Sequence, residues 1–199
     1  MNLPNKLSMI RIIAIPLVML FMLPISIYGF SPDGWNNFIS SYGMIVAGII
    51  FVIASLTDFA DGYIARKYNL ITDLGKFLDA LADKMLVISI LLAFIELGRI
   101  SAWPVMIICL REFMVTGIRL IASKDGVVMA AKMLGKIKTT TQMIAITFLM
   151  FEFIFIKLGL AVTTVTIIGD ILFYISVIMT IVSGMDYLLK NLHYFKESK

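Results

Sequence analysis

The chain has 199 residues, of which 60% are hydrophobic and 15% charged, and its formal net charge at pH 7 is +4. Soluble globular domains are less apolar and carry about 25% charged residues, so this composition excludes an ordinary soluble protein. Long apolar stretches recur over the whole length, which predicts an all-α integral membrane protein with a single domain over residues 1–199. The one cysteine, Cys109, excludes an internal disulfide.

Hydropathy predicts six transmembrane helices in one bundle. Polar, turn-rich segments separate them, and "GFSPDGWNNFISS" after the first span is expected to be a loop. The last span is long enough to tilt or break near Gly169. The six spans are expected at about residues 8–30, 43–65, 74–97, 103–122, 137–157 and 161–189.

The basic residues predict how the helices are oriented. With the N-terminus inside, all but two of the 17 lysines and arginines fall on the inner side or on segments directed toward it. Only Arg99 and Lys157 fall on outer loops. Lysine and arginine are enriched on the cytoplasmic side of membrane proteins. Both termini are therefore predicted to be cytoplasmic.

Four aspartates lie where the second and third spans reach the cytoplasmic interface. The purely apolar part of the second span, Met44 to Thr57, covers only about 21 Å at about 1.5 Å per residue. The hydrocarbon core is about 30 Å thick, so the turns that carry acids must enter the interface. Charged residues placed there face a bundle interior or a wet cavity. The four are Asp58, Asp61, Asp79 and Asp83.

The spacing of these acids predicts a metal site. Asp58 and Asp61 are three residues apart and Asp79 and Asp83 four apart, so each pair projects from one helical face. Two antiparallel helices joined by a short connector would bring the four carboxylates together. Like charges this close raise one another's pKa values unless a cation neutralises them, and hard divalent ions such as Mg²⁺ and Mn²⁺ bind all-oxygen groups.

Residues beside the acids suit a phosphate-containing ligand. Gly62 and Gly75 remove side chains next to the carboxylates, and Arg66 offers a planar fork to a phosphate. The alternative is a structural salt-bridge network in which the aspartates pair with Arg66, Lys76 and Lys84.

The segment "DFADGYIARKYNLITDLGKFLDALAD" resembles the CDP-alcohol phosphatidyltransferases, whose pattern D-x2-D-G-x2-A-R-x8-G-x3-D-x3-D it matches without a departure. Eight fixed positions at fixed gaps are far more specific than a lone DxxD. The segments "LPNKLSMIRIIAIP", "REFMVTGIR" and "GKIKTTTQM" are similar to the phosphatidylglycerophosphate synthase branch of that family. The resemblance thus touches every predicted span except the last.

The resemblance implies transfer of a phosphatidyl group from CDP-diacylglycerol to an alcohol, glycerol 3-phosphate in this branch, with release of CMP. It implies a divalent metal, Mg²⁺ or Mn²⁺ and expected as two ions, as cofactor. It further implies a homodimer in a bacterial inner membrane, with lipids and the two substrates but no nucleic acid as partners. Asp83 is the implied general base for the acceptor hydroxyl. The implied metal ligands are Asp58, Asp61, Asp79 and Asp83, and the implied CDP-diacylglycerol residues are Asn5, Ser8, Asp58, Asp61, Gly62, Arg66 and Gly75.

An acceptor that carries a phosphate needs positive charge near it. Arg111 and Arg119 are eight residues apart and share a face of the fourth span, and Lys136 and Lys138 begin the fifth. Charges within a span are functional by default, and arginine suits a phosphate. We therefore predict the acceptor-phosphate site on these four residues. In the alternative, Glu112 or a nearby aspartate neutralises Arg111 and the two lysines are cytoplasmic anchors.

Other functions stay open at this point. A relative within the same family would use serine, an inositol phosphate or phosphatidylglycerol as acceptor. An intramembrane prenyltransferase would carry two separated acidic motifs, and only one set is found here. A carboxylate-based cation transporter would often show internal repeats or broken helices.

Overall fold

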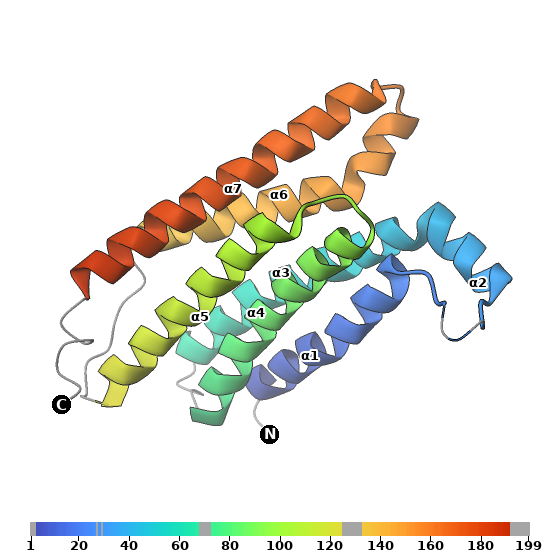
Figure 1. Ribbon diagram of the computed structural model, residues 1–199. Helices are drawn as coiled ribbons and strands as arrows, with labels where there is room; N and C mark the ends of the chain where they lie inside the picture. Colours follow the sequence, from blue (N-terminus) through green and yellow to red (C-terminus); the bar gives the residue numbers. More distant parts are fainter. Residues whose placement is uncertain (1–2, 27, 29, 68–72, 125–132, 192–199) are drawn as a thin grey trace. The chain divides into compact units, whose positions relative to one another are not determined.

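A computed structural model describes residues 3–26, 28, 30–67, 73–124 and 133–191. The side chains of residues 3–6, 58–67, 73–74, 76–77, 79–80 and 123–124 lie outside this description. The described residues form helices joined by short connections, which confirms the all-α prediction (Figure 1). The chain divides into two compact units, Met1–Ile100 and Ser101–Lys199.

The first unit is built around helix α1 (Leu3–Met22), which packs against α3 (Met44–Lys67) and α4 (Asp73–Glu96). On each helix the buried residues recur every three or four positions, the spacing of a single helical face. Several are alanines, which let helix backbones approach closely. The core includes Ala14, Val18, Met22, Ala47, Phe51, Ala54, Ala82, Leu86 and Ile90.

The prediction that the first span continues to residue 30 is wrong, because α1 ends at Met22. Pro24 follows shortly after, and a proline pushes the residue before it out of the helical region. Beyond it, the Asn36 side chain holds the chain in place. Its Oδ1 accepts a hydrogen bond from the Ile25 N–H at 2.9 Å, and its Nδ2 donates to the Ile25 carbonyl at 3.0 Å.

The segment expected to be a polar loop is helical in its second half, so that expectation is wrong there. Helix α2 (Asp33–Phe38) continues through a π-helical turn, η1 (Ile39–Gly43), directly into α3. Helical spacing places Trp35 and Phe38 on the side that meets Phe21 of α1, with ring centroids 5.6 and 6.5 Å away. Packing of these large rings outweighs the weak helix propensity of the glycine and asparagines nearby.

The contact between η1 and α1 predicts a stability effect at Gly43. A Cβ atom at Gly43 would lie 2.2 Å from the Phe21 carbonyl oxygen, a backbone atom that cannot swing away. We expect Gly43→Ala to lower the free energy of unfolding by about 1–3 kcal/mol, as overpacking does. Gly34→Ala is the matched control, because a Cβ there meets nothing within 4 Å. Thermal melting in detergent measures both, and equal midpoints would contradict the predicted clash.

The second unit comprises α5 (Ala102–Lys124), α6 (Met133–Lys157) and α7 (Val162–Lys190), with α7 packed against the other two. Helix α7 runs without a break through Gly169, so the expected break there is absent from this described helix. Gly169 is buried, and its small size serves close packing rather than a bend.

Glycines with positive φ end two of the long helices. After α4, Gly98 (φ 68°) donates its N–H to the Ile95 carbonyl at 2.9 Å. After α6, Gly159 (φ 95°) donates to the Ile156 carbonyl at 3.0 Å. Glycine occupies this left-handed conformation without a Cβ clash and satisfies carbonyls at the helix end. The resulting connections to α5 and α7 are short, as predicted.

Among the described residues, three helical segments are long and apolar enough to cross a membrane: Asp33–Thr57, Met133–Lys157 and Val162–Lys190. Large apolar side chains are also exposed on the long helices, including Ile53, Leu110 and Ile178. In water such surfaces would be unfavourable, whereas lipid accommodates them. The chain is therefore a multi-pass membrane protein, and its described residues form six long helices that overlap the six predicted spans, with α1 ending earlier than predicted.

Candidate active site

The four aspartates lie on two continuous helices, as their spacing predicted. Asp58 and Asp61 lie near the end of α3, and Asp79 and Asp83 lie in the first half of α4. The end of α3 and the start of α4 are at the same end of this unit as the start of α1 (Figure 1). Each pair therefore shares a helical face at that end.

Most of the predicted ligand side chains lie outside the described ones. These are Asn5, Asp58, Asp61, Gly62, Arg66 and Asp79. Within the part of the chain that is described, no three acidic, histidine or cysteine side chains gather as a metal site. The convergence of the four aspartate carboxylates on one metal site therefore stays a prediction.

Asp83 is paired with Arg11 of α1. Arg11 Nη1 donates a hydrogen bond to Asp83 Oδ1 at 2.6 Å. The Arg11 side chain is only 1% exposed, whereas the Asp83 side chain is 49% exposed. A buried cation thus holds one oxygen of a carboxylate whose side chain is about half exposed.

Ser8 and Arg11 lie one turn apart on the buried face of α1, which continues through Ala14. Ser8, predicted to bind nucleotide, is 3% exposed. Gly75, near the start of α4, is partly buried. Ser8 and Arg11 therefore lie on the helix face that packs into the unit, toward the end where the aspartates are.

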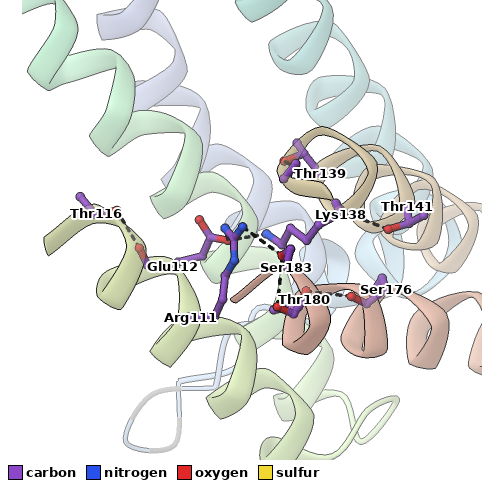
Figure 2. A network of polar contacts seen from close by, with 10 residues as sticks. Arg111, Glu112, Thr116, Lys138, Thr139, Thr141, Ser176, Thr180 and Ser183 are labelled. Atoms are coloured by element: carbon purple, nitrogen blue, oxygen red, sulfur yellow. Dashed lines mark hydrogen bonds and ion pairs between the residues drawn. The ribbon is translucent and has the colours of Figure 1, made fainter. Parts of the chain in front are cut away.

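In the second unit, two of the four predicted acceptor residues meet on one carboxylate (Figure 2). Arg111 Nη1 donates to Glu112 Oε1 at 3.0 Å, and Lys138 Nζ of α6 donates to the same oxygen. The exposed fractions of the Arg111, Glu112 and Lys138 side chains are 12%, 15% and 5%. These three side chains, two cations and one anion, have a summed formal charge of +1. The alternative that Glu112 pairs with Arg111 is confirmed, and the same carboxylate also binds Lys138.

Helix α7 holds Arg111 from another side. Ser183 Oγ accepts a hydrogen bond from Arg111 Nη2 at 3.1 Å and donates to the Thr180 carbonyl at 3.2 Å. Because its proton is directed to that carbonyl, the oxygen lone pairs of Ser183 are available to the guanidinium. A Cβ at Gly184 would lie 2.9 Å from Arg111 Cγ, so the glycine makes room for the arginine stem.

The other two predicted acceptor residues are placed differently. The Arg119 guanidinium carbon lies 5.6 Å from the centroid of the Tyr187 ring on α7, a cation–π geometry. Arg111 and Arg119 therefore share the face of α5 that meets α7, as predicted. Lys136 is exposed and lies two positions from the buried Lys138, so it lies on another face of α6.

Two buried donors near this cluster have no hydrogen-bond partner among the described residues, Arg111 Nε and Gln142 Nε2. Gln142 is 4% exposed and follows Lys138 by one helical turn. Buried donors are almost always satisfied in folded proteins. An oxygen-rich ligand could satisfy both of these.

Sequence reasoning assigned no site role to Arg11, Gln142, Ser183 or Gly184. A signal for Arg11 was available, because it falls on the three-to-four spacing of the buried face of α1. Gln142 stands within the segment "GKIKTTTQM", which was used only for the resemblance. Ser183 and Gly184 carry no such signal, since small residues in an apolar helix ordinarily serve packing.

The acidic pattern on two helices of a membrane protein, together with the basic cluster, indicates an enzyme that transfers a phosphate-containing group in lipid metabolism. Residues 1–182 match the CDP-alcohol phosphatidyltransferase family, and the chain belongs to it. A CDP-diacylglycerol–glycerol-3-phosphate 3-phosphatidyltransferase of Bacillus subtilis is 41% identical, covering 99% of this chain and 98% of the relative. A protein of the same name from Rickettsia bellii is 35% identical over 98% of this chain and 97% of its own length. A probable phosphatidylglycerophosphate synthase of Mycobacterium tuberculosis is 32% identical over 96% of this chain and 82% of its own.

Proposed function

We propose that the protein transfers the phosphatidyl group of CDP-diacylglycerol to glycerol 3-phosphate, giving phosphatidylglycerophosphate and CMP in phospholipid biosynthesis. The observation that carries this proposal is the complete eight-position aspartate pattern, set on the end of α3 and the start of α4. Relatives that carry this activity in their names align over nearly the whole chain. The buried cluster with a formal charge of +1 favours an anionic acceptor over serine.

The residues of the acidic end suit a divalent metal by their chemistry. Four carboxylates at helical spacings form an all-oxygen donor set, which hard cations prefer. The Asp83 side chain is 49% exposed, so a metal ion can approach it. We assign Asp58, Asp61, Asp79 and Asp83 to Mg²⁺ or Mn²⁺, with two ions expected. A bound divalent ion would neutralise negative charge on the pyrophosphate and on the departing CMP.

The protein's own residues would perform the remaining steps. The acceptor hydroxyl oxygen bonds to the phosphorus that carries diacylglycerol, and the bond from that phosphorus to the CMP oxygen breaks. The hydroxyl proton passes to the Asp83 carboxylate, which Arg11 holds at 2.6 Å. Asn5, Ser8, Gly62, Arg66 and Gly75 bind the cytidine diphosphate part. Arg111 and Lys138, which meet on Glu112, bind the acceptor phosphate, whereas Arg119 over the Tyr187 ring and Lys136 on another face of α6 serve its approach.

We further propose that all six long helices cross the membrane, with both termini and the acids on the cytoplasmic side. The distribution of basic residues supports this, with only Arg99 and Lys157 on the outer connections. A cytoplasmically active reporter fused to the C-terminus should be functional, and a silent reporter would argue against this orientation. A homodimer, typical of the family, remains a prediction.

Release of CMP tests the proposed function. Purified protein mixed with CDP-diacylglycerol, Mn²⁺ or Mg²⁺ and glycerol 3-phosphate should release one CMP for each phosphatidylglycerophosphate formed. Serine, inositol phosphate and phosphatidylglycerol are the parallel acceptors. Faster release with one of them would assign the protein to another branch of the family, and no release with any acceptor would reject the transferase.

Arg111 is the acceptor residue with the largest expected effect on binding. Arg111→Ala should raise KM for glycerol 3-phosphate by about 10–100-fold, equivalent to about 1.4–2.8 kcal/mol, since a guanidinium fork is lost. Glu112 keeps Lys138 as its partner in this variant, so the cluster retains an ion pair. The KM for CDP-diacylglycerol should stay within about twofold.

Lys157→Ala is the control for Arg111→Ala, because it removes a cation at the far end of α6, where Lys157 lies over the Phe153 ring. Both KM values of this control should match those of the unchanged protein. If Arg111→Ala also had the KM for glycerol 3-phosphate of the unchanged protein, Arg111 would not belong to the acceptor site.

A further inference from the structure

We propose that Glu112 is a positioning residue of the acceptor site, which holds the Arg111 and Lys138 head groups together for the acceptor phosphate. This inference rests on the proposed function and extends it to a residue of opposite charge. Glu112 lies on α5, and its Oε1 accepts hydrogen bonds from Arg111 Nη1 at 3.0 Å and from Lys138 Nζ (Figure 2). The acceptor that it serves is a small phosphomonoester.

The geometry of the cluster is unusual for neighbours along a helix. Side chains at i and i+1 do not ordinarily face each other, yet Arg111 and Glu112 form an ion pair. The pair forms because both side chains turn toward α6, where Lys138 lies, and because Gly184 admits the Arg111 stem against α7. Ser183 holds the other terminal nitrogen of Arg111 at 3.1 Å. Both terminal nitrogens of the Arg111 guanidinium are thus held in place, Nη1 by Glu112 and Nη2 by Ser183.

Two alternative roles for Glu112 predict opposite changes in the acceptor KM when its carboxylate is neutralised. If Glu112 only occupied the place of the phosphate, its neutralisation would release two cations and lower KM for the acceptor. A positioning role predicts a rise. Lys138 is 5% exposed, and removing one partner of a buried ion pair is strongly unfavourable for the charge that stays. Glu112→Gln should therefore displace the Lys138 head group and release Arg111 Nη1, so that the site loses an ordered cation.

Arg111, held in place by Glu112 and Ser183, still has a buried donor, Nε, that is left for an oxygen of the acceptor phosphate. This nitrogen has no hydrogen-bond partner in the part of the chain that the structure describes, although Glu112 and Ser183 engage the two terminal nitrogens. The arginine thus keeps a donor for a further oxygen while its orientation is set.

The test compares steady-state kinetics of purified Glu112→Gln and unchanged protein with both substrates. We expect KM for glycerol 3-phosphate to rise by about tenfold or more. The KM for CDP-diacylglycerol and kcat at saturating acceptor should each stay within about threefold. An unchanged or lower acceptor KM overturns the inference. If the unchanged protein prefers another acceptor, the proposed function fails, and the KM for that acceptor then tests Glu112 separately.

Two further variants separate this role from a loss of folding. Glu152→Gln removes a carboxylate from α6 about 21 Å along the helix from Lys138, and its acceptor KM should be unchanged. If Glu112→Gln does not elute as folded protein, Glu112→Asp takes its place. This variant keeps the charge but withdraws the carboxylate, and we expect an acceptor KM at least about threefold higher. An unchanged KM would again overturn the inference.

Combined variants show whether Glu112 acts through the two cations that it holds. If it does, adding Glu112→Gln to the Arg111→Gln, Lys138→Gln double variant should raise the acceptor KM no further, since groups in one network are not additive. A further rise would mean that Glu112 contributes independently of both cations, which contradicts the positioning role.

Discussion

Replacing Asp61 by asparagine is expected to lower kcat by about three orders of magnitude. The side chain keeps its shape but loses the charge that a divalent ion needs. Electrostatic stabilisation by a catalytic metal amounts to several kcal/mol, and each 1.36 kcal/mol is a factor of about ten in rate. The titration of bound Mn²⁺ by electron paramagnetic resonance should show a much weaker site, which is a measurement independent of activity.

Asp73→Asn is the matched control for Asp61→Asn. Asp73 is the first residue of α4 and lies outside the aspartate pattern, so its loss should affect the helix start alone. Its kcat and Mn²⁺ affinity should stay within about twofold of the unchanged protein. If Asp61→Asn bound Mn²⁺ normally and still lost activity, Asp61 would have a role other than metal ligand.

The helices could be predicted because the period and length of apolar runs are local properties of the chain. The errors occurred where local signals competed. Composition favoured a loop after the first span, but the aromatic residues Trp35 and Phe38 recur at helical spacing and pack against Phe21. Pro24 marked the true end of α1, yet the apolar residues beyond it extended the hydropathy signal to residue 30.

The candidate site likewise has features that could be predicted from the sequence and features that could not. The aspartate pairs are three and four residues apart, so their shared faces follow from helix geometry alone. Contacts between different helices do not follow from the geometry of a single helix. Arg11 reaches Asp83 and Arg111 reaches Ser183, each across 72 positions of the chain. Lys138 reaches Glu112 across 26 positions. Such contacts depend on how helices pack against each other, and hydropathy leaves the packing unspecified.

Arg11→Met is expected to lower kcat by about 100-fold without abolishing metal binding. Methionine fills part of the buried space of the arginine stem, so the main loss is the hydrogen bond at 2.6 Å to Asp83 Oδ1. Asp83 is 49% exposed and stays hydrated, but its position is then no longer fixed. A misplacement of about 1 Å in a catalytic group can cost about 100-fold in rate.

Metal affinity separates this positioning role from a structural one. Removing a cation beside the acids makes that end of the protein more negative, which offsets the loss of a fixed position for Asp83, so the Kd for Mn²⁺ should stay within about threefold. Arg11→Lys keeps the charge and should recover part of kcat, whereas Arg99→Met, which removes an arginine from the connection after α4, should leave kcat unchanged. A kcat for Arg11→Met within about twofold of the unchanged protein would show that Asp83 holds its place without Arg11. Complete loss of Mn²⁺ binding in that variant would instead show that Arg11 supports the fold of the acidic end, because a residue that acts only through Asp83 affects one of the four proposed ligands and leaves the other three in place.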